Sequence, residues 1–186
     1  MSRVCGWWGA GAYVVLAGVV LGCTALPPEV DPVLRKAVQP VVHDALVASL
    51  EKDVGVLSDY VELSPTARWF CAEQVVEIRE TENGTLQVGI EAVCSELASR
   101  GGTLVQGTAV RAPWVWELSP DRKGGHQVRR EDTAPDGAWY DAWIGRSFSK
   151  GGAAVVRHGD WDGTDAMEAQ ARTHFGLPED APVTEA

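Results

Sequence analysis

The chain is poor in positive charge. Its 186 residues hold 16 Lys and Arg against 26 Asp and Glu, which gives a formal net charge of −10. Proteins that bind DNA or RNA hold the phosphate backbone with Lys and Arg side chains, so this balance argues against a nucleic-acid partner. With 45% hydrophobic and 23% charged residues, the composition is that of a globular protein and not of a disordered one.

Cysteines and catalytic motifs are also scarce. Four cysteines are too few for a disulfide-rich scaffold, and their spacing, without any Cys-x-x-Cys, is not that of a zinc site. The sequence contains no Gly-x-Ser-x-Gly, no phosphate-binding Gly-x-x-x-x-Gly-Lys loop and no His-Glu-x-x-His. We therefore expect no cofactor and no catalytic residue, and a protein that is not an enzyme.

The N-terminus holds the longest uncharged stretch of the chain. Arg3 and the α-amino group form a short positive region, and residues 6–22 that follow carry no charge. After Cys23 the composition changes abruptly to TALPPEVD. A positive end, an apolar stretch and a small residue before a cleavage point are the parts of an export signal.

The end of this stretch resembles the lipobox of bacterial lipoproteins. Val20-Leu21-Gly22-Cys23 places a small residue directly before a cysteine, although Leu21 stands where that family usually has Ala, Ser or Thr. The resemblance implies that the Cys23 thiol receives a diacylglycerol with fatty-acyl chains such as palmitate, and that the chain is cut between Gly22 and Cys23. Residues 1–22 would then be the signal peptide, and residues 23–30 the lipidated N-terminus and tether.

Two other fates of the leader remain open. A spanning helix needs roughly 17–20 apolar residues, so the uncharged stretch could stay as a membrane anchor. An ordinary secretory signal cut nearby is the second alternative. All three interpretations place the body outside the cytoplasm. The lipoprotein interpretation holds it at the extracytoplasmic face of the cell membrane, because two acyl chains anchor stably where one binds only marginally.

The body, residues 31–178, predicts a single α+β domain. Asp31-Pro32 is a typical helix start, and apolar residues follow at helical spacing as far as Leu50, with Pro40 expected to kink or split the helix. Residues 165–175 predict a short closing helix, and residues 179–186 a flexible tail. The strand-like runs between the helices are 70–79, 86–92, 103–118, 126–130 and 153–157. We expect the N-terminal helix to pack on a curled antiparallel sheet of four to six strands, as in cystatin-like or nuclear-transport-factor-2-like folds by analogy alone.

Cys71 and Cys94 lie in the first two predicted strands of a chain that meets an oxidising compartment, so we expect a disulfide between them; two separate buried thiols are the alternative. A hairpin that pairs Ile78 with Val88 on the core face would point the two thiols to opposite faces of the sheet. A β-bulge near Val75-Val76, where the alternation slips, would bring both thiols to one face.

Six tryptophans lie beyond the leader. Trp114 and Trp116 share a face of their predicted strand, and Trp139 and Trp143 share a face if residues 137–148 are helical. We expect these side chains to fill a core that is poor in Phe and Ile. The alternative is an exposed aromatic row that binds a glycan, an apolar ligand or a protein partner.

The densest polar cluster spans residues 158–165. Asp160, Asp162 and Asp165 are a weak candidate for a Ca²⁺ site, but their spacing does not fit the EF-hand pattern. We expect a polar turn in which Thr164 or Asp165 caps the closing helix. The alternative is a small cell-envelope hydrolase that uses His158 with Asp160 or Asp162.

Together these patterns predict a lipid-anchored extracytoplasmic lipoprotein whose body is a non-catalytic binding or structural module. Its partners would be the membrane, through the lipid, and an unknown protein or glycan.

Overall fold

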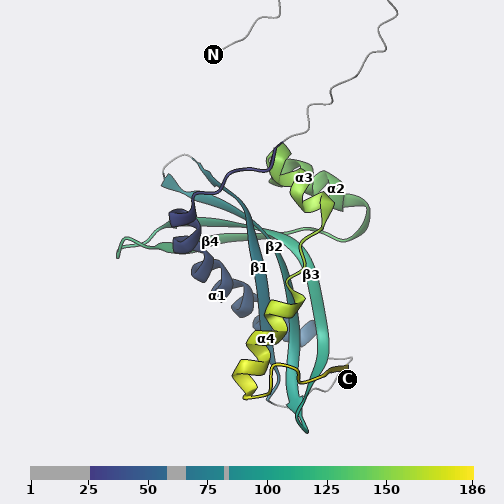
Figure 1. The fold of residues 1–186 in the computed structure, drawn as a ribbon. Coiled ribbons are helices and arrows are strands. Elements are labelled where there is room, and N and C mark those ends of the chain that lie inside the picture. Colours follow the sequence, from purple (N-terminus) through teal and green to yellow (C-terminus); the bar gives the residue numbers. More distant parts are fainter. Residues whose placement is uncertain (1–25, 58–65, 82–83) are drawn as a thin grey trace, which may run out of the picture.

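The computed structural model describes residues 26–57, 66–81 and 84–186 (Figure 1). Gly22 and Cys23 lie outside these residues, as do Glu82 and Asn83 of the predicted hairpin turn. The strands are β1 (Arg68–Glu80), β2 (Leu86–Arg100), β3 (Thr103–Pro120), β4 (His126–Thr133) and β5 (Val183–Glu185). The helices are α1 (Pro32–Leu57), the 3₁₀ turn η2 (Gly137–Trp139), α2 (Tyr140–Ser147), α3 (Lys150–His158) and α4 (Thr164–Phe175). Within the described residues, no helix is long and apolar enough to cross a bilayer.

The five strands form one open sheet, so the predicted α+β class is confirmed. Strands β1 to β4 pair in chain order and antiparallel, but β5 pairs with β3 in parallel, so the sheet is mixed and not wholly antiparallel. The flexible tail predicted for residues 179–186 is therefore wrong for Val183–Glu185. This strand is held at both ends, because the Leu104 amide donates to the Pro182 carbonyl (2.9 Å) and the Ala186 amide to the Gln106 carbonyl (3.0 Å).

Helix α1 covers one face of the sheet. It begins as predicted, because the Asp31 carboxylate accepts hydrogen bonds from the amides of Val33 (2.7 Å) and Leu34 (3.3 Å). Pro40 lies inside the helix and does not split it. The fully buried side chains Val38, Val42 and Leu46 lie on both sides of the proline and pack on the same sheet face, which holds the two halves together.

Helices α2, α3 and α4 cover the opposite face (Figure 1). The strand predicted for residues 153–157 is wrong, because this run belongs to α3. The Ser149 hydroxyl caps α3 by accepting from the Gly152 amide at 3.0 Å, and Gly159 ends it in the left-handed conformation at φ 62°. A run of four apolar residues is too short for its periodicity to separate strand from helix, so these two caps decide the outcome.

Strand β1 contains the β-bulge that the sequence predicts. Ile78 pairs with Val88 and Cys71 pairs with Cys94, and the register shifts between Val75 and Glu77. The two sulfur atoms lie 2.15 Å apart, so the expected disulfide is present. A regular hairpin that pairs Ile78 with Val88 would point the two thiols to opposite faces. The extra residue at Val76 shifts the register by one, so that Cys71 pairs directly with Cys94.

The same bulge turns Glu77 away from α1 and toward the start of α3. Its side chain is only 2% exposed. Its carboxylate accepts from the Ser149 amide at 3.0 Å and from the Ser149 hydroxyl at 2.5 Å, and the guanidinium of Arg79 lies 3.0 Å away. A carboxylate at the positive end of a helix is favourably placed, so Glu77 fastens α3 to the sheet.

Gly152 is required where α3 meets Glu77. A Cβ at this position would lie 2.9 Å from the Glu77 carboxyl carbon and 3.2 Å from the Phe148 ring. We predict that Gly152→Ala lowers the free energy of unfolding by about 1–3 kcal/mol through overpacking.

Gly145 in α2 is the matched control, because a Cβ there would meet only the end of the Arg157 side chain at 3.7 Å. Gly145→Ala should raise the free energy of unfolding by up to about 1 kcal/mol through helix propensity. Urea denaturation of both variants measures the difference. Equal stability of the two variants would contradict the contact between Glu77 and α3.

Candidate functional site

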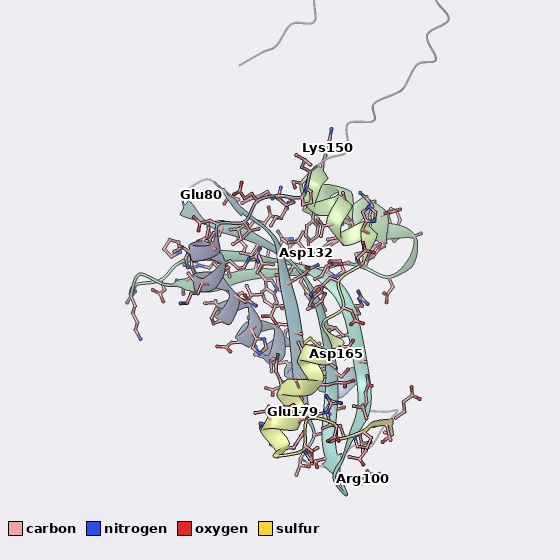
Figure 2. All side chains as sticks on the ribbon, viewed as in Figure 1. Glu80, Arg100, Asp132, Lys150, Asp165 and Glu179 are labelled. Atoms are coloured by element: carbon pink, nitrogen blue, oxygen red, sulfur yellow. A yellow bond between two sulfur atoms is a disulfide. The ribbon has the colours of Figure 1, made fainter. Side chains whose placement is uncertain are left out.

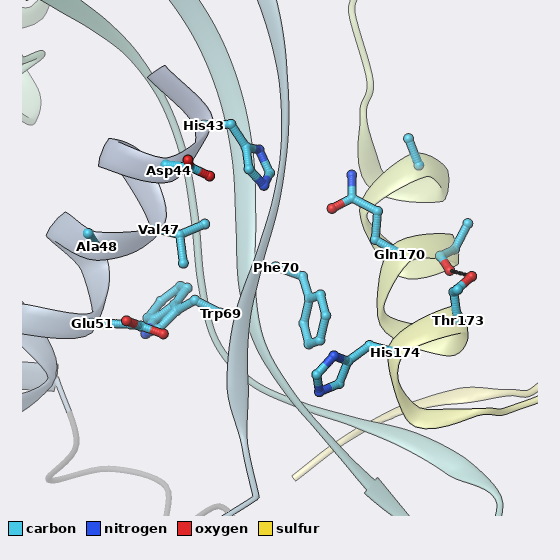
Figure 3. A pocket seen from close by; sticks show the side chains of 12 residues that line it. His43, Asp44, Val47, Ala48, Glu51, Trp69, Phe70, Gln170, Thr173 and His174 are labelled. Atoms are coloured by element: carbon cyan, nitrogen blue, oxygen red, sulfur yellow. Dashed lines mark hydrogen bonds between the residues drawn. The ribbon is translucent and has the colours of Figure 1, made fainter. Parts of the chain in front are cut away.

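A groove lies between α1 and α4, at the outer edge of β1. Its volume is about 880 Å³. Figure 3 shows α1 on one side, α4 on the other and β1 between them. The lining side chains are His43, Asp44, Val47, Ala48 and Glu51 from α1, Trp69 and Phe70 from β1, and Ala166, Ala169, Gln170, Thr173 and His174 from α4.

The apolar floor of the groove comes from two neighbouring residues of β1. Successive side chains of a strand point to opposite faces, so Trp69 packs with α1 while Phe70 packs with α4. The Phe70 ring meets the His174 ring edge-on, with the ring centroids 5.4 Å apart. The indole N–H of Trp69 is buried and has no acceptor among the described residues. The groove therefore straddles the edge of the sheet and lies over both of its faces.

The backbone of β1 is open on this side. In the described part of the chain β1 pairs with β2 alone. The Cα atoms of the paired residues Cys71 and Cys94 are 4.1 Å apart, the short spacing of a pair that exchanges no backbone hydrogen bonds. The N–H and C=O of Cys71 therefore point away from β2, and by the two-residue period so do those of Trp69 and Glu73.

A half-buried pair of His43 and Glu73 closes the wall of the groove on the α1 side. Glu73 is the β1 residue that faces α1 beside the cysteine, and its side chain is only 5% exposed. Its carboxylate lies 2.9 Å from the His43 Nδ1 and accepts from the side-chain Nε2 of Gln39 at 3.2 Å. The hydrogen bond to Glu73 raises the pKa of His43 above its ordinary value of 6.5, although desolvation opposes the shift.

Acidic groups dominate the rim of the groove. Asp44 directly follows His43 on α1, and Glu51 lies about two turns further along; both are exposed and line the groove. The α4 wall offers no acid, only small or neutral side chains with His174 at its end. The site is thus an open, apolar-floored groove whose rim attracts positive charge.

The tryptophans do not form the exposed aromatic row that was the alternative to core packing. Trp114 and Trp116 share a face as predicted, but both are buried beneath α1, and Trp143 of α2 is buried against the opposite face of the sheet and α3. The exposed row considered for ligand binding is therefore wrong for these three residues, which fill the core. Trp139 differs, because its side chain is 71% exposed in η2.

The polar cluster at residues 158–165 forms the turn before α4. The carboxylate of Asp162 accepts from both the amide (2.9 Å) and the hydroxyl (2.6 Å) of Thr164, so Asp162, and not Thr164 or Asp165, supplies the side chain at the start of α4. These bonds keep the pKa of Asp162 low. Within the described residues no three His, Cys, Asp or Glu side chains are placed to hold a metal ion, so Asp160, Asp162 and Asp165 do not assemble a Ca²⁺ site.

Sequence reasoning missed the groove and its ion pair. His43 and Glu73 are 30 residues apart, and neither carries a local motif. The available signal was the position of Glu73 in β1, where it shares the core face with Cys71 and needs a buried partner.

No protein-family model, curated protein or solved structure matches this chain.

The pair of His43 and Glu73 predicts a pH dependence of stability. A histidine whose pKa is raised by folding stabilises the protein fully below the unfolded pKa of 6.5, and this contribution is lost as the pH rises through the higher folded value. The free energy of unfolding, measured in urea on both sides of pH 6.5, should therefore fall with rising pH. Glu73→Gln should make the free energy of unfolding less dependent on pH, whereas the control His174→Gln should not change this dependence. The same pH dependence in wild type and Glu73→Gln would refute the pairing.

Proposed function

We propose that this protein is a lipid-anchored extracytoplasmic binding module. Cys23 carries the lipid, and the groove at the β1 edge receives an extended, positively charged segment of a partner protein. The observation that carries the binding proposal is the open backbone edge of β1 inside the groove. The lipobox-like sequence that ends at Cys23 supports the anchor.

An extended peptide is the ligand that best suits this edge. The outward N–H and C=O groups of Trp69, Cys71 and Glu73 offer the hydrogen bonds that a further strand would complete. A natural sheet usually protects such an edge with bulges, charges or a covering element, because it invites pairing with other chains. Here the two flanking helices leave it accessible and would contact the side chains on both faces of an added strand.

The disulfide prepares the edge for binding. The bond between Cys71 and Cys94 joins β1 to β2 within the groove segment, at two fully buried residues. An edge strand fixed in its bound conformation loses less conformational freedom when a partner strand adds to it. The bond thus supplies rigidity that an outer strand would otherwise have to supply.

Charge and packing favour a protein segment over a glycan. The acidic rim at Asp44 and Glu51 attracts Lys and Arg side chains of a peptide. Trp114, Trp116 and Trp143, which could have stacked on sugar rings, lie in the core. The pairing of His158 with Asp162 in the hydrolase alternative gains nothing from the geometry, because the Asp162 carboxylate is held by Thr164.

Intact mass spectrometry tests the anchor. We predict that protein purified from membranes lacks residues 1–22 and carries an added mass of lipid size, and that Cys23→Ser abolishes both changes. Cys5→Ser is the matched control, since this cysteine lies in the leader and should not alter processing. A full-length, unmodified wild-type chain would reject the lipid anchor.

Selection of random peptides on the immobilised body tests the groove. We predict that the enriched peptides alternate apolar residues with Lys or Arg, and that Ala169→Trp, which fills the α4 wall, abolishes their binding. Ala37→Trp is the control, because Ala37 is an exposed alanine of α1 outside the groove. Binding that survives Ala169→Trp, or the absence of any enriched peptide, would contradict the proposal.

A further inference from the structure

The first described residues run across the start of α3 (Figure 1). The Leu26 carbonyl contacts Gly151 so closely that a Cβ at this position would overlap it, and the same Cβ would lie 3.3 Å from the Pro28 ring. Only glycine leaves room for the crossing chain. The tether therefore does not leave the body freely, because it is seated on α3 from Leu26 onward.

We propose that the α2–α3 end of the protein lies against the membrane surface. This orientation rests on the proposed lipid anchor at Cys23. Two residues, Thr24 and Ala25, separate Cys23 from Leu26. An extended chain spans at most about 3.6 Å per step, so the three steps from Cys23 to Leu26 span about 11 Å at most. A lipid on Cys23 thus brings Gly151 and the start of α3 to the level of the lipid headgroups.

The charge at this end fits such a surface. Residues 140–158, which span α2 and α3, contain three cations, Arg146, Lys150 and Arg157, and one acid, Asp141, in a chain whose net charge is −10. Arg146 and Lys150 are exposed, whereas Arg157 pairs with Asp141. Anionic headgroups attract such exposed cations within a Debye length and repel the acidic remainder of the body.

Two exposed apolar side chains belong to the same end. Leu26 is 82% exposed where the tether meets α3, and Trp139 is 71% exposed directly before α2. Tryptophan is favoured at the boundary between lipid and water, where its ring meets the headgroups. Neither side chain is part of the core, so both are free to contact lipid in the proposed orientation.

This orientation turns the groove away from the membrane. Figure 2 places Lys150 at one end of the molecule and Arg100, at the β2–β3 turn, at the other. Helix α4 and the second half of α1, which line the groove, lie toward the Arg100 end (Figure 1). A partner protein could then reach the β1 edge without passing between the body and the bilayer.

Position-specific quenching tests the orientation on the full lipidated chain. Lys150→Cys and Arg100→Cys are labelled separately with a fluorophore, because Cys71 and Cys94 are buried and bonded. Each protein is reconstituted into vesicles of phosphatidylethanolamine and phosphatidylglycerol that carry a short-range headgroup quencher. We expect the label at position 150 to lose most of its fluorescence and the label at position 100 to lose none.

A second variant tests the seat of the tether. Gly151→Leu should lift residues 26–28 from α3 and reduce the quenching at position 150, while Gly145→Leu, on α2, should preserve it. The mass of each preparation is measured first. A chain without lipid would refute the anchor itself, whereas a lipidated chain with equal quenching at positions 150 and 100 would overturn the orientation alone.

Discussion

One extra residue in β1 decides how the rest of the molecule is arranged. Before the β-bulge at Val76, Cys71, Glu73 and Val75 face α1; beyond it, Glu77 faces α3. Without the bulge, either the three residues before it would face away from α1 or Glu77 would face away from α3, because a shift of one residue exchanges the faces of a strand. The bulge thus aligns the disulfide and also places the carboxylate that fastens α3.

The groove follows from this division of β1 between two helical layers. Trp69 and Glu73 bind α1 on one face, and Phe70 binds α4 on the other, so the two helices flank the strand edge without covering it. The disulfide holds the strand in place, and the pair of His43 and Glu73 joins it to α1. Stability and the binding surface therefore rest on the same short segment.

The sequence predicts local features better than distant pairings. The Asp31 cap, the pairing of Ile78 with Val88 and the bulge each follow from residues close in the chain, and the structure confirms them. The parallel pairing of β5 with β3 joins segments about 80 residues apart, and no pattern within Val183–Glu185 specifies it. The sequence does not predict the pair of His43 and Glu73 for the same reason, because no residue near either side chain in the sequence indicates its partner.

Amide hydrogen exchange along β1, resolved by residue, tests the open edge most directly. An open edge predicts an alternation in the isolated protein. The amides of Ala72 and Gln74, which point to β2, exchange slowly, and those of Cys71 and Glu73, which point to the groove, exchange fast. Uniformly slow exchange at all four positions would mean that the edge is already paired, and would contradict a groove that is free to accept a strand.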